Sequence, residues 1–146
     1  MKIGVASDHR GVIIKDKLIS YLKKIGYDVV DYGTNDKKSV DHPLYAFKLC
    51  EDIGTKISFG VLLCGTGIGM SIAANKVNGI RCAKVSSLAE AKLSRMHNNA
   101  NVIALSSNMS LFKMKGIVKT FLNTDFLNEE KYIRRNNMVD NYASKL

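Results

Sequence analysis

The fold is decided by the stretch Phe59-Gly-Val-Leu-Leu-Cys64-Gly-Thr-Gly-Ile-Gly69. Its first half is almost wholly apolar, which is typical of a central parallel strand buried on both faces. Its second half places glycine at every other position, which permits a tight turn. Helical spacing then continues to about Val77. The stretch therefore predicts a strand, a glycine loop and a helix in direct succession.

On either side of this stretch, short β-rich runs alternate with amphipathic helical patterns. The expected strands are Lys2–Ser7, Tyr27–Asp31, Phe59–Leu63, Arg81–Val85 and Asn101–Leu105. Gly26 suits the C-cap of the first helix, and Ser87-x-x-Glu90 is a capping-box signature for the fourth. The pattern predicts an α/β fold: a Rossmann-like three-layer α/β/α sandwich with a five-stranded parallel sheet and a C-terminal helix.

Length and composition narrow the class of protein. The 146 residues are expected to form one domain, 1–146. The composition, 46% hydrophobic and 24% charged residues, is close to the average of globular proteins. No apolar run approaches the ~20 residues that span a bilayer, and the N-terminal run is too short for a signal peptide. The three cysteines have no disulfide-like spacing, so we expect a reduced, cytoplasmic protein without membrane contact.

The net charge of +9 suits an anionic partner but does not identify one. The lysines are scattered, no basic run exceeds two residues, and no aromatic residues are interleaved with them. Single-strand binding needs such interleaving, so we expect no nucleic-acid partner and mostly solvated surface charge. A phosphorylated small molecule remains a plausible ligand.

Ligands of parallel α/β sheets bind at the carboxyl ends of the strands, and four polar segments are expected at that rim. They are Asp8-His9, the loop around Asp41-His42, Cys64–Gly69 and His97-Asn98. Together they would bring nucleophile, acid and base side chains to one edge of the sheet.

Cys64 is the strongest candidate for chemistry. The glycine loop after it directs backbone N–H groups towards an anion, and this setting is expected to lower the pKa of the thiol and make a thiolate available as base or nucleophile. A buried structural cysteine is the alternative, and we expect that role for Cys50 and Cys82, which lie within apolar patterns. The G-x-G-x-G spacing, with no acidic residue after the fourth strand, argues against a dinucleotide site.

The remaining candidates are less specific. The three histidines have no metal-ligand spacing, so no metal site is expected. His97 lies in a polar turn and His42 beside a helix start, where each can be merely structural. Lys131 and Arg135 are four residues apart and share a helix face, which suits a phosphate group or simply a solvated surface.

The sequence resembles type B ribose-5-phosphate isomerase, grouped with the galactose-6-phosphate isomerase subunits. The resemblance covers about residues 2–135 and is carried by the segments IGVASDHRG (3–11), VVDYGT (29–34), DHPLY (41–45), CGTGIGMSIAAN (64–75), GIR (79–81) and SRMHNNAN (94–101). It implies a Rossmann-like homodimer, with a tetramer as the alternative, whose active sites are shared between subunits, and no cofactor.

The resemblance also implies roles for individual residues. Cys64 corresponds to the general base that moves a proton between C2 and C1 of the sugar, and His97 to the residue that opens the furanose ring, aided by Asp8 of the partner subunit. The backbone amides of the loop would stabilise the enediolate, with Thr66 assisting proton movement at the oxygens. The implied substrate-binding positions are His9, Gly65, Gly67, Ile68, Gly69, Asn98, Lys131 and Arg135.

Three positions depart from the family pattern. Lys131 replaces the first arginine of a C-terminal pair, Asn108 replaces an arginine after the fifth strand, and His42 stands where many members have tyrosine. We expect interconversion of D-ribose 5-phosphate and D-ribulose 5-phosphate in the non-oxidative pentose phosphate pathway. The alternatives are an isomerase of a six-carbon aldose phosphate, such as allose or galactose 6-phosphate, and a non-catalytic phosphosugar- or nucleotide-binding module.

Overall fold

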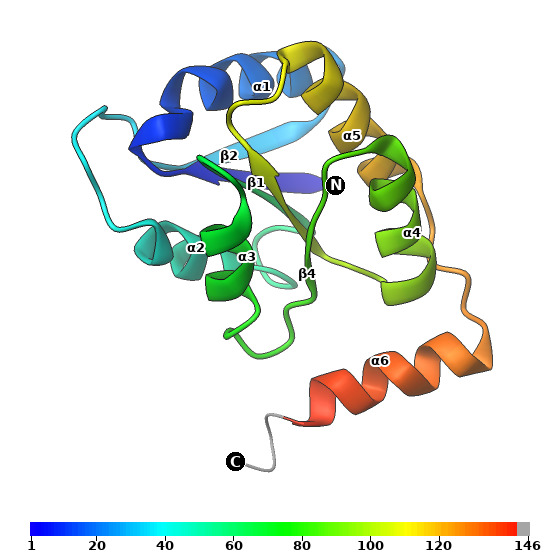
Figure 1. Ribbon diagram of the computed structural model, residues 1–146. Coiled ribbons are helices and arrows are strands. Elements are labelled where there is room, and N and C mark those ends of the chain that lie inside the picture. The colour runs from blue at the N-terminus through cyan, green and yellow to red at the C-terminus, as the bar shows by residue number, and fades with distance from the viewer. Residues whose placement is uncertain (143–146) are drawn as a thin grey trace.

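The chain folds around a five-stranded parallel sheet, seen here in a computed structural model that describes residues 1–142 (Figure 1). The strands are β1 (Lys2–Ser7), β2 (Asp28–Gly33), β3 (Phe59–Cys64), β4 (Cys82–Lys84) and β5 (Val102–Ser106). They lie in the order β2-β1-β3-β5-β4 and every pairing is parallel. The expected sheet is confirmed: both ends of β1 and the start of β3 are as expected, and the other strand ends differ by one or two residues.

Helices cover both faces of the sheet. They are α1 (Val12–Lys24), α2 (His42–Cys50), α3 (Ile68–Ala74), α4 (Leu88–Asn98), α5 (Leu111–Asn123) and α6 (Glu130–Tyr142), with a short 3₁₀ helix, η1, at His9–Gly11. Helices α1, α4 and α5 share one apolar core with the sheet, and α2 and α3 share the other. This is the expected three-layer sandwich.

Successive side chains of each strand point to opposite faces of the sheet, and therefore to the two cores in turn. In β3, Val61 and Leu63 pack towards α1, α4 and α5, whereas Leu62 and Cys64 pack towards α2 and α3. The thiol of Cys64 therefore lies on the α2/α3 face, at the end of a strand buried on both sides.

Helix α3 ends at Ala74, three residues before the expected Val77. The reason is the side chain of Asn75, which replaces backbone partners at the helix end. Its amide nitrogen donates to the carbonyls of Ser71 and Cys82, and its oxygen accepts the N–H of Cys82. These bonds turn the chain towards β4. The Ser87 cap is confirmed, and the Glu90 carboxylate accepts the N–H of Ser86.

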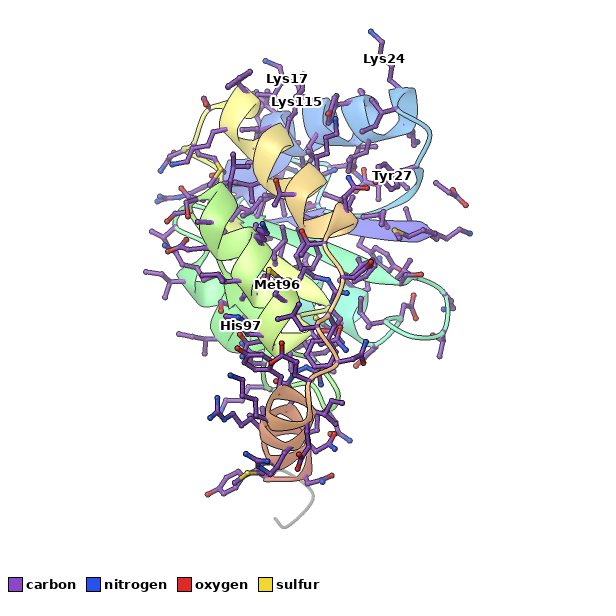
Figure 2. All side chains as sticks on the ribbon, turned by 90° about the vertical axis from the view of Figure 1, so that its right-hand side faces the viewer. Lys17, Lys24, Tyr27, Met96, His97 and Lys115 are labelled. Carbon is purple, nitrogen blue, oxygen red and sulfur yellow. The ribbon has the colours of Figure 1, made fainter. Side chains whose placement is uncertain are left out.

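The expectation that His97 and Asn98 share the carboxyl rim with Cys64 is wrong within one chain. Helix α4 follows β4 and runs back antiparallel to the strands, so its last turn lies where β5 begins. The amino edge of the sheet therefore carries His97, while the carboxyl edge carries Cys64. Figure 2 shows His97 at the end of α4 that lies beside α6.

Helix α6 stands apart from the two helical layers and packs against α4 at this amino edge (Figure 1). Its apolar side chains Met138, Val139 and Tyr142 are largely exposed. Within residues 1–142, no helix combines the length and the apolar character needed to cross a membrane.

Candidate active site

The carboxyl edge is centred on Cys64, whose side chain is 6% exposed. The N–H of Gly67 donates a hydrogen bond to its Sγ at 3.1 Å. Gly67 has a φ of +82°, and a Cβ there would lie 3.0 Å from the carbonyl carbon of Leu105. Glycine at this position is therefore what allows the loop to turn back onto β5 and present its N–H to the sulfur.

The glycine loop is held in place from several sides. The Thr66 hydroxyl accepts the N–H of Ile68 at 3.1 Å. The Gly65 carbonyl accepts the Ser106 hydroxyl at 2.7 Å and the Asn108 amide at 3.2 Å. These hydrogen bonds hold the loop in one conformation, as a group of preorganised donors requires. Sequence reasoning missed this supporting role of Asn108.

Asp8 and His9 lie at the same edge. The N–H of Asp8 donates to the carbonyl of Leu63, the residue before Cys64, and its carboxylate caps η1 by accepting the N–H of Arg10 at 2.9 Å. The Nδ1 atom of His9 accepts the N–H of Val40 at 3.2 Å, so His9 ties down the loop before α2.

Two side chains to which sequence reasoning gave no binding or catalytic role also reach the glycine loop. The Nε2 atom of His42 lies 2.7 Å from where a Cβ on Gly69 would be, and an Nη atom of Arg10 lies 3.2 Å from the same point on Gly65. Each glycine leaves room for a nitrogen-bearing side chain. Their position in the sequence could have indicated this contact, because both residues follow the carboxyl end of a strand.

The other two cysteines differ from Cys64 in environment. Burial raises the pKa of Cys50 to about 12, with a smaller contribution from Glu51. Loss of solvent likewise raises the pKa of Cys82 to about 12. Both thiols are therefore protonated at neutral pH and unsuited to act as bases, in agreement with the structural role expected for them.

The amino edge gathers a second group of candidate residues around the end of α4. The ring of His97 stacks on Tyr132 of α6, with centroids 4.5 Å apart and an interplanar angle of 13°. The Asn136 amide donates to the carbonyl of His97, and Arg81 donates to the carbonyl of Asn98 while pairing with Asp140 of α6 at 2.6 Å. Helix α6 is thereby attached to the turn that carries His97.

Lys131 and Arg135 lie on this same helix, so they belong to the amino edge. The Lys131 ammonium lies 4.9 Å from the Tyr132 ring centroid. A cavity of about 200 Å³ beside this group is lined in part by Arg81, Asn98 and Asn136. His97, Asn98 and the helix that carries the two cations thus lie at one edge of the sheet, separated from Cys64 by the length of β5, roughly 13 Å at 3.3 Å per residue.

The arrangement has two halves with different chemistry. The carboxyl edge offers a thiol, a carboxylate and oriented N–H groups, which suit proton transfer next to a carbonyl. The amino edge offers an imidazole and cations, which suit acid–base work on a phosphorylated ligand. Among residues 1–142, no group of three or more His, Cys, Asp or Glu side chains is arranged to hold a metal ion.

Comparisons with known proteins show the family to which the chain belongs. The family model described as Ribose/Galactose Isomerase matches residues 3–139. Ribose-5-phosphate isomerase B of Escherichia coli is 39% identical over 127 residues, covering 86% of this chain and 85% of that protein. The galactose-6-phosphate isomerase subunit LacB of Clostridium acetobutylicum is 36% identical, covering 86% of this chain and 74% of that protein.

Solved structures extend the likeness to three dimensions. The ribose-5-phosphate isomerase B of Clostridium thermocellum superposes with a TM-score of 0.95 at 39% identity, covering 99% of each chain. This chain therefore belongs to the ribose/galactose isomerase family.

Proposed function

We propose that this protein is an aldose–ketose isomerase that interconverts D-ribose 5-phosphate and D-ribulose 5-phosphate through an enediolate, a reaction of the non-oxidative pentose phosphate pathway. The observation that carries the proposal is the Cys64 sulfur held by the Gly67 N–H beside a preformed loop of backbone donors, in a chain of this family. A base next to oriented N–H groups is what proton transfer between adjacent carbons requires.

In the proposed mechanism, the Cys64 thiolate removes the proton from C2 of the open-chain aldose. The electron pair moves to form the C1–C2 double bond, and the carbonyl oxygen becomes the enediolate oxyanion. The amides of Gly65 and Gly69 stabilise that charge, joined by those of Gly67 and Ile68 as these release the Cys64 sulfur and the Thr66 hydroxyl. Thr66 relays the proton between the oxygens. The Cys64 thiol then returns its proton to C1, which completes the ketose without a cofactor or a metal.

The ring must open before this step, and we assign that role to His97. Asn98 binds a sugar hydroxyl and His9 contacts the sugar or its phosphate, while Lys131 and Arg135 bind the phosphate. Because His97 and Cys64 lie at opposite edges of one chain, the complete site requires a second copy. In this arrangement Cys64 and Asp8 belong to one subunit, and the turn around His97 belongs to its partner.

We therefore propose a homodimer with shared active sites. The exposed apolar side chains of α6 (Met138, Val139 and Tyr142) and of α3 (Ile68 and Ile72) support it, because apolar surface of this kind is commonly covered by a partner.

The free thiols Cys50, Cys64 and Cys82 favour a reducing compartment, the cytoplasm. We further propose that residues 1–146 form a single sugar-phosphate isomerase domain, of which residues 143–146 lie outside the described part.

The direct test compares wild type with Cys64→Ala in a ribose 5-phosphate isomerisation assay without added metal or cofactor. Loss of the base is expected to lower kcat by about 10²- to 10⁴-fold while phosphosugar binding persists. Unchanged turnover in Cys64→Ala would remove Cys64 from the mechanism. If folded wild type turned over only a six-carbon aldose phosphate, the proposed substrate would be wrong. If it turned over no phosphosugar, the proposed activity would be wrong.

A further inference from the structure

Arg10 is a cation placed on the glycine loop. One Nη atom of its guanidinium lies 3.2 Å, and its Cδ atom 3.3 Å, from where a Cβ on Gly65 would be, so the side chain lies flat against the residue that follows Cys64. Asp8 fixes its backbone by accepting the Arg10 N–H at 2.9 Å. The backbone of η1 is thereby fixed, and the Arg10 guanidinium lies beside the glycine loop.

This guanidinium forms no ion pair or hydrogen bond with any residue in the described range 1–142. Other arginines of the chain are engaged: Arg81 pairs with Asp140, and Arg95 donates to the carbonyls of Thr124 and Ala100. The Arg10 side chain is exposed. A planar cation that is positioned, accessible and unpaired matches an oxyanion that accepts two N–H groups, such as phosphate.

An uncharged residue, Asn108, also contacts Gly65. Asn108 donates its amide to the Gly65 carbonyl at 3.2 Å. Family resemblance implies an arginine at this position, whereas here the positive charge beside Gly65 comes from Arg10 in the loop after β1. Both residues contact the same glycine, so the two positions can serve the same ligand group.

We propose that Arg10 binds the phosphate group of the substrate at the carboxyl edge, supplying from the β1–α1 loop the charge that Asn108 lacks. The inference rests on the proposed function for the identity of the substrate, and it adds a phosphate-binding residue that neither the sequence patterns nor the family resemblance assigns. The phosphate would then lie between Arg10 of one subunit and Lys131 and Arg135 of the other.

The test measures KM and kcat for ribose 5-phosphate together with competitive inhibition by inorganic phosphate. The variants are Arg10→Ala, Arg10→Ala with Asn108→Arg, and Lys24→Ala as a matched loss of one exposed positive charge at the far end of α1 (Figure 2). We expect Arg10→Ala to raise KM and the phosphate inhibition constant about tenfold or more with kcat changed less than about threefold. The double variant should regain most of the affinity, and Lys24→Ala should behave as wild type.

Two results would overturn the inference. Arg10→Ala with unchanged KM and unchanged phosphate inhibition would show that the guanidinium does not bind phosphate. A fall in kcat alone would place Arg10 at the reacting atoms instead. Failure of the proposed function is distinguishable, because wild type would then fail to isomerise ribose 5-phosphate. In that case, calorimetry of inorganic phosphate binding to wild type and to Arg10→Ala still tests whether Arg10 binds phosphate.

Discussion

The two edges of the sheet are built by different means. At the carboxyl edge, backbone groups do most of the positioning: the Gly67 N–H holds the Cys64 sulfur, and the loop folds onto β5 because glycine allows it. At the amino edge, side chains of α6 hold the turn that carries His97, through the Tyr132 ring and the Asn136 amide. Under the proposed function, the two edges are two half-sites, and the complete site combines the carboxyl edge of one chain with the amino edge of another.

The same difference predicts how each edge tolerates change. A backbone-built site is sensitive to any side chain that alters the path of the loop, whereas a side-chain-built site loses one contact at a time. Substitutions at the two edges should therefore produce separable defects, one in proton transfer at carbon and the other in handling the cyclic sugar.

The largest effect expected at the amino edge comes from His97→Ala, which leaves the Cys64 loop intact. Ring opening should slow, so conversion of ribose 5-phosphate is expected to fall about 10²-fold. Exchange of the C1 hydrogen of ribulose 5-phosphate with D2O should stay within about threefold of wild type, because this ketose is already open-chain and exchange needs only the Cys64 edge. The two readouts are a coupled conversion assay and proton NMR.

Cys64→Ala is the matched control, since it should abolish both conversion and exchange. If His97→Ala lost conversion and exchange to the same extent, the division of labour between the edges would be wrong.

A smaller effect is expected from Gly67→Ala, which strains the carboxyl edge alone. The φ of +82° and the close approach to Leu105 disfavour any side chain at this position. We expect the free energy of unfolding in urea to fall by about 1–2 kcal/mol. Gly79→Ala shares the positive φ of +81° but has open space around it, so it controls for backbone strain. Equal stability losses in the two variants would show that contact with β5 contributes nothing.

Much of the fold follows from short-range patterns. The apolar run Phe59–Leu63, the glycines after it and the Gly26 cap predicted strands and helix ends to within about two residues, because burial and backbone freedom act locally. Cys64 was identifiable for the same reason, since its neighbours in sequence are also its neighbours in space.

The errors arose where side chains act over longer range. His97 was expected beside Cys64, but the direction of α4 puts it at the opposite edge. Asn75 ended α3 early by bonding to β4, and Arg10 reached Gly65 from another loop. None of these contacts leaves a periodic signal, because each joins residues whose spacing in the sequence carries no information about their distance in the fold.

The central claim is that Cys64 and His97 act together across two chains, and mixing two inactive variants tests it most directly. Cys64→Ala and His97→Ala are combined in equal amounts under conditions of subunit exchange, and isomerisation of ribose 5-phosphate is measured. Half of the randomly assorted dimers would contain one intact site of two, so about a quarter of wild-type activity should return. No recovery, with exchange verified by mass spectrometry of differently labelled subunits, would contradict the shared site.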